Sequence, residues 1–312
     1  GEPGAGRSIA ALHQKVLDVS PQPVRANWKT LDAGPRMTEM QATFKTSATG
    51  MLYDWLPEES RTAEARLWLP TGRGAPVSAC AVLLAGTGDH GYARRKALGQ
   101  ILVDRGMAVL ALESPFYGSR KPSGQKGSKL RHVCDLLALG KATILETRDL
   151  LALLRQEMGF SKMAVCGLSM GGVHACMVAG LSEEPLACIP MLSPYSASVP
   201  YVEPGMLGRA CAWDNLREGD ATHEEVKRKL DRVLRVTDVT LYPRPARPGA
   251  TVVVGGVGDR YVPPRAVEPL HAWAGPESEI RWIQAGHVSA HVFFHKQLAQ
   301  AVEDATGRLS LG

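Results

Sequence analysis

The sequence contains no hydrophobic run long enough to cross a lipid bilayer as a helix. A spanning helix needs roughly 18 or more consecutive apolar residues, whereas the best candidate, residues 107–112, ends at Glu113. We therefore expect a soluble or peripheral protein. The chain begins at Gly1 rather than at a methionine, which is compatible with a processed leader. An intracellular location is expected, with the mitochondrion or another organelle as open alternatives.

The sequence also lacks paired cysteines, internal repeats and a large excess of charge. Its six cysteines show no CxxC spacing, and several lie in apolar runs, so they are predicted to be reduced core residues. A net charge of +5 is too small to indicate nucleic-acid binding. It is compatible with an acidic substrate or with peripheral contact to an anionic membrane. With 312 residues and 45% hydrophobic composition, one large globular core is expected.

From residue 77 onward, short apolar runs alternate with helix-length stretches. Strands are expected at residues 79–85, 107–112, 163–166, 186–192, 250–254 and 279–284, and helices at 94–105, 130–158, 170–181 and 288–305. This βαβ order predicts an α/β fold with a mostly parallel central sheet and helices on both faces. Two earlier strand-like segments, 40–44 and 65–69, suit an antiparallel start to the sheet.

Two segments fall outside this alternation. Residues 1–37 carry Gly, Pro and isolated apolar positions, and are predicted to form an N-terminal arm with one short helix around residues 9–17. Residues 38–312 then form the main domain. Within it, residues 196–248 combine proline-rich turns with a charged, helical stretch at 224–236, which predicts a short lid insertion.

The strongest motif is Gly167-Leu168-Ser169-Met170-Gly171, a G-x-S-x-G sequence between an apolar run and a helix-length stretch. In a nucleophile elbow the serine occupies a strained strand-to-helix turn that exposes its hydroxyl. The helix start places the Met170 N–H and the positive end of the helix dipole near a developing oxyanion. The motif predicts Ser169 as nucleophile and Met170 as an oxyanion donor; the alternative is a glycine-rich turn with an incidental serine.

An acid and a base follow Ser169 in the chain order that α/β hydrolases use, which is serine, acid, histidine. Asp259 follows the β-branched run at 251–254 and three nearby glycines, and His287 follows the strand-like run at 280–284. A serine hydroxyl needs an imidazole to accept its proton, and a carboxylate to orient that imidazole. Ser169, Asp259 and His287 are therefore the predicted catalytic residues.

Other acids and histidines fit the pattern less well. Asp238 lies in the lid with no strand before it, and Asp214 and Asp220 are weaker still. His287, His291 and His295 are spaced four apart, but no carboxylate accompanies them, so neither a metal nor a cofactor is predicted. His174, inside the elbow helix, is expected to pack or cap.

The loop at residues 86–91 follows an early strand, and its Thr87 N–H is the best candidate for the second oxyanion donor.

Four cations lie on loops that gather at the same end of the sheet: Arg94, Arg95, Arg120 and Lys121. They have two interpretations. They could bind a negatively charged substrate such as a phospholipid or another acidic acyl ester, or they could pair with carboxylates such as Asp89 and Glu113.

Four segments resemble the alpha/beta hydrolase domain-containing protein 18 family: LAGTGDH at 84–90, ESPFYGSRKP at 113–122, GLSMGG at 167–172 and GHVSA at 286–290. The resemblance covers about residues 38–305, and the first two segments are more specific than G-x-S-x-G. It implies an α/β-hydrolase fold, the triad Ser169, Asp259 and His287, and the Thr87 loop in the oxyanion hole. The lid of this chain is shorter than the insertion that some relatives carry.

These observations lead to one hypothesis and two alternatives. The hypothesis is a serine hydrolase that cleaves carboxylic esters, of lipids or other acyl groups, through an acyl-serine intermediate. The first alternative is an acyltransferase that uses the same triad. The second is a non-catalytic α/β-hydrolase scaffold that binds a ligand or partner. The sequence assigns no oligomeric state.

Overall fold

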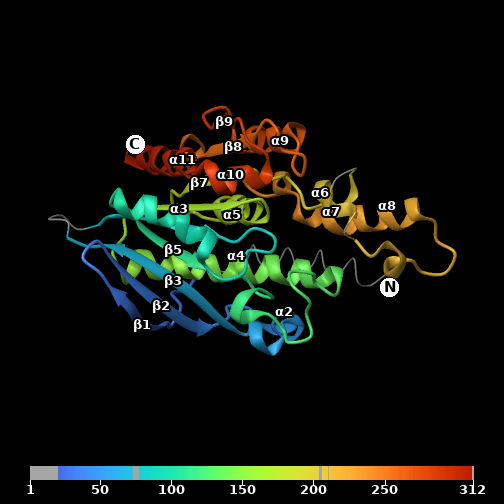
Figure 1. Ribbon diagram of the computed structural model, residues 1–312, viewed down its shortest axis with the longest axis horizontal. Helices are drawn as coiled ribbons and strands as arrows, with labels where there is room; N and C mark the ends of the chain where they lie inside the picture. The colour runs from blue at the N-terminus through green and yellow to red at the C-terminus, as the bar shows by residue number, and fades with distance from the viewer. Residues whose placement is uncertain (1–19, 73–76, 204–205, 210, 311–312) are drawn as a thin grey trace.

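The computed structural model describes residues 20–72, 77–203, 206–209 and 211–310. The short helix expected around residues 9–17 lies outside this part of the chain. The described residues form one sheet of nine strands in the order β1-β2-β3-β5-β4-β6-β7-β8-β9 (Figure 1). None of their helices is long and apolar enough to cross a membrane.

The sheet begins antiparallel and continues parallel. The strands are β1 (Asn27–Ala33), β2 (Met37–Lys45), β3 (Thr62–Pro70), β4 (Ala79–Leu84), β5 (Ala108–Leu112), β6 (Lys162–Leu168), β7 (Ala187–Met191), β8 (Val252–Gly256) and β9 (Glu279–Ile283). β1, β2 and β3 pair antiparallel, and β3 joins β5 antiparallel. All later pairings, from β5 through β4 to β9, are parallel, which confirms the predicted mostly parallel α/β sheet.

Helices cover both faces of the sheet, and each face has its own hydrophobic core. α3 (Ala93–Asp104) and α11 (His295–Gly307) pack on one face, while α4 (Val133–Gln156), α5 (Met170–Gly180) and α9 (Pro264–Ala274) pack on the other. Successive side chains of a strand point to opposite faces. In β4, accordingly, Val82 belongs to the core under α4, α5 and α9, and Leu83 belongs to the core under α3 and α11.

Three parts of the fold differ from the expectations. Residues 27–33 were predicted to belong to the arm, but they form the edge strand β1; all but one of them are exposed, so no apolar alternation marks the strand. α2 (Gly50–Trp55) and α9 were not predicted. The expected helix at 288–305 is two helices, α10 (His287–Phe293) and α11, separated at Phe294, whose φ and ψ are −113° and 16°.

The segment between β7 and β8 contains helices and no strand among its described residues. They are α6 (Ser198–Val202), α7 (Met206–Arg209) and α8 (His223–Leu234), and Figure 1 shows them together at one end of the molecule. The expected helix at 224–236 corresponds to α8, which buries Val226, Leu230 and Leu234 at helical spacing.

All six cysteines are free. Cys80, Cys166, Cys176 and Cys188 are buried, as expected for core residues, whereas Cys134 is exposed and Cys211 is half-buried. The core prediction is therefore wrong for the last two.

Candidate active site

Ser169 lies in the tight turn that joins β6 to α5. Its φ of 54° and ψ of −120° are rarely adopted by a residue with a side chain. Backbone hydrogen bonds hold this conformation: Ser169 N–H donates to the Met191 carbonyl at 2.9 Å, and the Ser169 carbonyl accepts from Gly172 N–H at 3.0 Å. The turn is thus fixed from β7 on one side and from α5 on the other.

The glycines of the motif allow this turn to pack closely. A Cβ on Gly167 would lie 2.4 Å from the carbonyl carbon of Gly171, and a Cβ on Gly171 would lie 2.4 Å from the carbonyl oxygen of Leu84. Real Cβ atoms do not approach backbone atoms this closely. The spacing of the two glycines around Ser169 therefore follows from the contact of α5 with β6 and β4.

Asp259 and His287 form a hydrogen-bonded pair. Asp259 follows β8, and its Oδ2 lies 2.7 Å from Nδ1 of His287, the first residue of α10 after β9. The other carboxylate oxygen of Asp259, Oδ1, accepts from the N–H groups of Tyr261 at 2.8 Å and Val262 at 2.9 Å. The Asp259 side chain is fully buried, and both of its oxygens therefore have fixed partners.

The partner of Nδ1 determines the state of the His287 ring. A hydrogen bond from Nδ1–H to a carboxylate leaves Nε2 of the neutral imidazole as the acceptor nitrogen. The Tyr261 ring stacks on the imidazole with centroids 5.1 Å apart and an interplanar angle of 30°. Together these contacts fix the tautomer and the orientation of the ring.

The topology brings these side chains to one edge of the sheet. Ser169, Asp259 and His287 follow the carboxyl ends of β6, β8 and β9, which run parallel. A small pocket supports this arrangement, because His291, one helical turn after His287, lines it together with Gly86 and Leu168.

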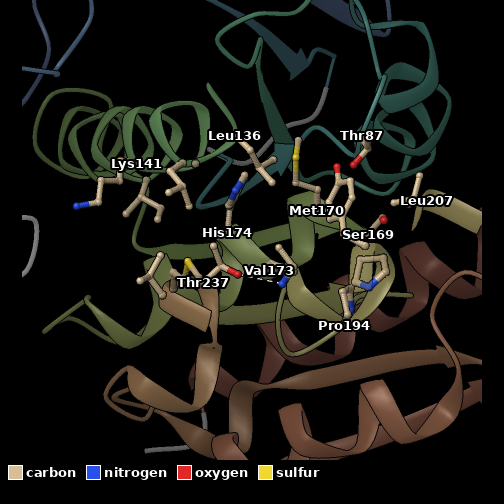
Figure 2. Close-up of a pocket in the computed structure, with 18 of the residues that line it drawn as sticks. Thr87, Leu136, Lys141, Ser169, Met170, Val173, His174, Pro194, Leu207 and Thr237 are labelled. Carbon is tan, nitrogen blue, oxygen red and sulfur yellow. Dashed lines mark hydrogen bonds between the residues drawn. The ribbon is translucent and has the colours of Figure 1, made fainter. Parts of the chain in front are cut away.

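Thr87 and Met170 lie beside Ser169 at the end of a larger pocket (Figure 2). A Cβ on Gly86 would lie 2.9 Å from the Leu168 carbonyl oxygen and 3.9 Å from the Ser169 Cβ, so the residue before Thr87 touches the serine turn. Met170 begins α5 directly after Ser169. The two residues predicted as oxyanion donors therefore flank the serine.

The larger pocket extends from Ser169 between α4, α5 and the segment before β8. Its empty volume is about 730 Å³ when the open space at its mouth is counted. Leu137 and Ile144 of α4 and Val173 and Met177 of α5 form its walls. The predicted lid segment adds further side chains, namely Ala197, Pro200, Tyr201, Leu207, Val236, Thr237 and Tyr242. The pocket is therefore mainly apolar.

Two of the predicted substrate-binding cations are buried in ion pairs. Arg95 Nε lies 3.0 Å from Asp89 Oδ2, and Arg95 Nη2 lies 3.6 Å from Glu113 Oε2. Arg120 is 1% exposed, and it donates two hydrogen bonds, of 2.6 and 2.7 Å, to the buried Glu146 carboxylate. These contacts support the structural interpretation and argue against a role in substrate binding for Arg95 and Arg120.

Arg94 has a different environment. It is exposed and lines the small pocket together with Leu168 and His291. It is the predicted substrate-binding arginine whose position remains compatible with that role. Lys121 is half-buried on the loop after Arg120.

The competing acid and the other histidines take no part in the Asp259–His287 pair. Asp238 Oδ1 accepts from the Thr240 N–H and hydroxyl, at 2.9 and 2.7 Å, and so caps a local turn. His174 is buried and lines the larger pocket. Burial, with the charge of Arg94, lowers the pKa of His291 to about 4, so it is neutral at pH 7.

A metal-like cluster occurs elsewhere. Among the described residues, His132, Cys134 and Asp135 bring potential ligand atoms within 4.8 Å of one another. His132 and Cys134 are exposed, and Asp135 accepts a hydrogen bond from the His132 N–H at 2.9 Å. The cluster is explained by capping of the α4 N-terminus.

Sequence reasoning missed two buried charged groups on α4, Glu146 and Lys141. Glu146 is fully buried in its pair with Arg120, and Lys141 is 6% exposed and lines the larger pocket. Leu137, Lys141 and Ile144 are spaced four and three apart on one helix face. That spacing could have identified Lys141 as a charged residue on an apolar face.

Comparison with solved structures gives the fold. An acetyl xylan esterase from a Paenibacillus species matches with a TM-score of 0.61 and 18% identity, over 94% of this chain and 92% of that one. Acetyl xylan esterase 1 from a Thermoanaerobacterium species matches with a TM-score of 0.66 and 15% identity, over 95% and 93%. Both likenesses identify an α/β-hydrolase fold, as predicted.

Comparison with known sequences gives the family. Uncharacterized proteins from two strains of Mycobacterium tuberculosis are 28% identical over 212 residues, which is 65% of this chain but 48% of each of theirs. The chain therefore spans about half the length of these relatives. The model of the family described as "Alpha/beta hydrolase domain containing 18" matches residues 7–222 and 217–308. The chain belongs to the alpha/beta hydrolase domain containing 18 family.

Proposed function

We propose that this protein is a serine hydrolase that cleaves carboxylic esters, of lipids or other acyl groups, through an acyl-enzyme on Ser169. The observation that carries the proposal is the Asp259–His287 hydrogen bond of 2.7 Å, formed at the sheet edge where Ser169 occupies a strained turn. A strained serine and an oriented imidazole on loops after parallel strands are what acyl transfer requires.

The reaction follows from these positions. Ser169 Oγ attacks the ester carbonyl carbon while His287 Nε2 accepts the hydroxyl proton. The bond to the alcohol oxygen then breaks, and the imidazolium gives its proton to that oxygen. Water repeats the sequence on the acyl-serine and releases the acid. Asp259 keeps Nδ1–H in place and stabilises the imidazolium without itself taking the proton.

Thr87 and Met170 would stabilise the charge that develops on the carbonyl oxygen. Backbone N–H groups aimed at an oxyanion typically contribute about 3 kcal/mol each in a site that excludes water. Met170 N–H also lies at the positive end of the α5 dipole. The predominantly apolar pocket beside these residues suits an acyl chain.

The solved neighbours support an ester as the substrate class. Two are acetyl xylan esterases, and a third is a brefeldin A esterase, described as a bacterial homologue of human hormone sensitive lipase. The third matches with a TM-score of 0.54 and 14% identity, over 99% of this chain and 87% of that one. These activities belong to the neighbours. For this chain we infer from them only the type of bond that is cleaved, an ester.

A fluorophosphonate probe tests the proposal without knowledge of the natural ester. We expect the purified protein to be labelled covalently and the Ser169→Ala variant to be neither labelled nor active. Its hydrolysis of p-nitrophenyl esters should fall by roughly 10³-fold or more. Circular dichroism of both proteins controls for folding. Labelling that persists in the variant would move the nucleophile to another residue.

The products distinguish hydrolysis from the alternatives. Release of free acid at the rate of probe-sensitive turnover indicates hydrolysis, whereas acyl transfer to an added alcohol at the expense of free acid indicates an acyltransferase. If the protein is not labelled and turns over no ester, the non-catalytic scaffold is the alternative that remains.

A further inference from the structure

The larger pocket is a passage along two helices with Ser169 at one end. Residues on one face of α4 and one face of α5 line it, and Figure 2 shows His174 between Lys141 and Ser169. From Met170 to Met177 the α5 side of the passage is about 10 Å long, given the helical rise per residue. An extended acyl chain of intermediate length is about as long as this wall.

Lys141 lies in the wall of this passage, away from Ser169. The residue is 6% exposed, and its Nζ is buried with no hydrogen-bond partner among the described residues. Burial lowers the pKa of this amine to about 7. An amine that can hold a charge but has no partner is costly to bury.

Other buried cations of the protein do have partners. Arg120 is paired with Glu146, and Arg95 with Asp89 and Glu113. Among the described residues, those that line the passage include no Asp or Glu, so they offer Lys141 no carboxylate. His174 adds a second polar atom, because its buried Nδ1 has no hydrogen-bond partner in the part of the chain that the structure describes. Burial lowers the pKa of His174 to about 4, so this ring is neutral at pH 7 and can donate one hydrogen bond.

The position of the proposed base indicates which half of an ester enters the passage. The alcohol oxygen must lie within reach of His287 Nε2 to receive its proton. His287 does not line the passage, whereas Ser169, Thr87 and Met170 do. This arrangement favours the acyl half of the substrate in the passage and the alcohol half on the side of His287.

We propose that the acyl group ends in a carboxylate that binds Nζ of Lys141, so that the preferred substrates are half-esters of dicarboxylic acids. This inference rests on the proposed ester hydrolysis at Ser169. The terminal carboxylate supplies the acceptor that Lys141 lacks, and the apolar walls contact the methylene groups between the two carbonyl carbons. Lys141 is then a specificity-determining residue and takes no part in bond breaking.

Matched esters test the inference directly. p-Nitrophenyl hydrogen suberate and p-nitrophenyl octanoate share a leaving group and the number of acyl carbons, and differ in the terminal carboxylate. We expect the protein to prefer the suberate ester in kcat/KM. Lys141→Met should lower kcat/KM for suberate by about 10- to 100-fold, which is the worth of a charge-assisted hydrogen bond. It should raise kcat/KM for octanoate, because methionine gives an apolar chain end a better contact than a buried amine does.

Lys129→Met is the matched control, because Lys129 is exposed and outside the passage. It removes the same charge and should change neither substrate. Suppose that octanoate turnover depends on Ser169, that suberate is not preferred, and that Lys141→Met has no effect. This result would overturn the inference about Lys141 but not the proposed ester hydrolysis. Absence of labelling and of all turnover would instead overturn the proposed function.

Binding of the free acids can be measured in a variant that does not turn over substrate. In the Ser169→Ala background, free suberate should raise the thermal unfolding temperature, and octanoate should raise it less. Adding Lys141→Met should abolish the suberate shift. An equal shift with and without Lys141 would place the carboxylate elsewhere and contradict the inference even if the variant enzyme is inactive.

Discussion

Asp259 is a buried carboxylate with a fixed partner on each oxygen. Two backbone N–H groups bind Oδ1, and Oδ2 binds His287. Asp259→Asn keeps the volume and the Oδ1 contacts, but an amide can present N–H to Nδ1 and so favour the wrong tautomer. We expect kcat for p-nitrophenyl esters to fall by about 10²- to 10⁴-fold with little change in thermal stability.

Asp238→Asn is the control for this prediction, because it also neutralises a carboxylate. Asp238 Oδ1 accepts from Thr240, and an amide oxygen can do the same. Activity should stay close to that of the unmodified protein. A large loss for Asp238→Asn together with a small loss for Asp259→Asn would reassign the acid to the lid segment.

Arg120 and Arg94 give a contrast between a buried and an exposed cation. Arg120→Met leaves the fully buried Glu146 without its ion-pair partner, and breaking such a pair typically costs about 3–5 kcal/mol. Arg94→Gln changes an exposed side chain and should change the free energy of unfolding by less than about 0.5 kcal/mol. Urea denaturation of both variants measures the difference.

The double variant Arg120→Met with Glu146→Met tests why Arg120→Met lowers the free energy of unfolding. If the loss comes from an unpaired buried charge, removing Glu146 as well should recover part of it. A double variant as unstable as the sum of the two single variants would mean that the pair itself contributes nothing and that packing explains the loss.

At this scale the sequence predicted the positions of side chains better than their contacts. The places of Ser169, Asp259 and His287 after β6, β8 and β9 could be predicted because each follows a strand whose apolar run is evident, and because the fold uses a fixed chain order. The partners of Arg120 could not be predicted. Glu146 lies 26 residues away on a helix, and only the packing of α4 against the loop after β5 brings the two together.

Among the elements, the junction of α5 with β4 and β6 depends on backbone contact. A Cβ on Gly171 would lie 2.4 Å from the Leu84 carbonyl oxygen, and backbone atoms cannot move aside as side chains can. Gly171→Ala should therefore push α5 away from the sheet and displace Ser169. We expect ester hydrolysis to fall by at least about 10-fold, with a loss of stability of about 1–3 kcal/mol.

Gly307→Ala is the matched control at the end of α11. A Cβ there would meet nothing within 4 Å. Alanine also has the higher helix propensity, so stability should be unchanged or slightly higher. Chemical denaturation and turnover of the two variants test the prediction. Full activity in Gly171→Ala would mean that the turn tolerates a shift of the helix.

The elements that the sequence predicted well are those with a strong apolar pattern. β4 to β8 are almost entirely buried, and α3 to α5 each bury several apolar side chains. β1 was missed because its residues are exposed and it is held by backbone pairing with β2. The boundary between α10 and α11 was missed because apolar periodicity continues across Phe294, and only the backbone angles mark the break.

For the whole molecule, Lys141 links stability to pH. Its pKa is about 7 in the folded protein, against an ordinary value of 10.5, because burial disfavours the ammonium. Between these two values the unfolded chain holds a proton on Lys141 that the folded chain lacks, so raising the pH stabilises the folded state. The gain is at most about 1.4 kcal/mol per pH unit from this group. Below about pH 7 both states are charged, and the full cost of burial remains.

Lys141→Met removes this dependence, because methionine has a similar shape and does not titrate. The variant should be more stable than the unmodified protein by a few kcal/mol near pH 6, on the order expected from the pKa shift, and the gap should close toward about pH 10. Urea denaturation across this range measures it, with Lys129→Met as the exposed control. A gap that stays constant with pH would mean that the Lys141 amine titrates alike in the folded and unfolded chains. A difference in the free energy of unfolding that narrows toward high pH would show that the charge of Lys141 lowers stability. A residue that serves substrate binding is expected to show such a cost.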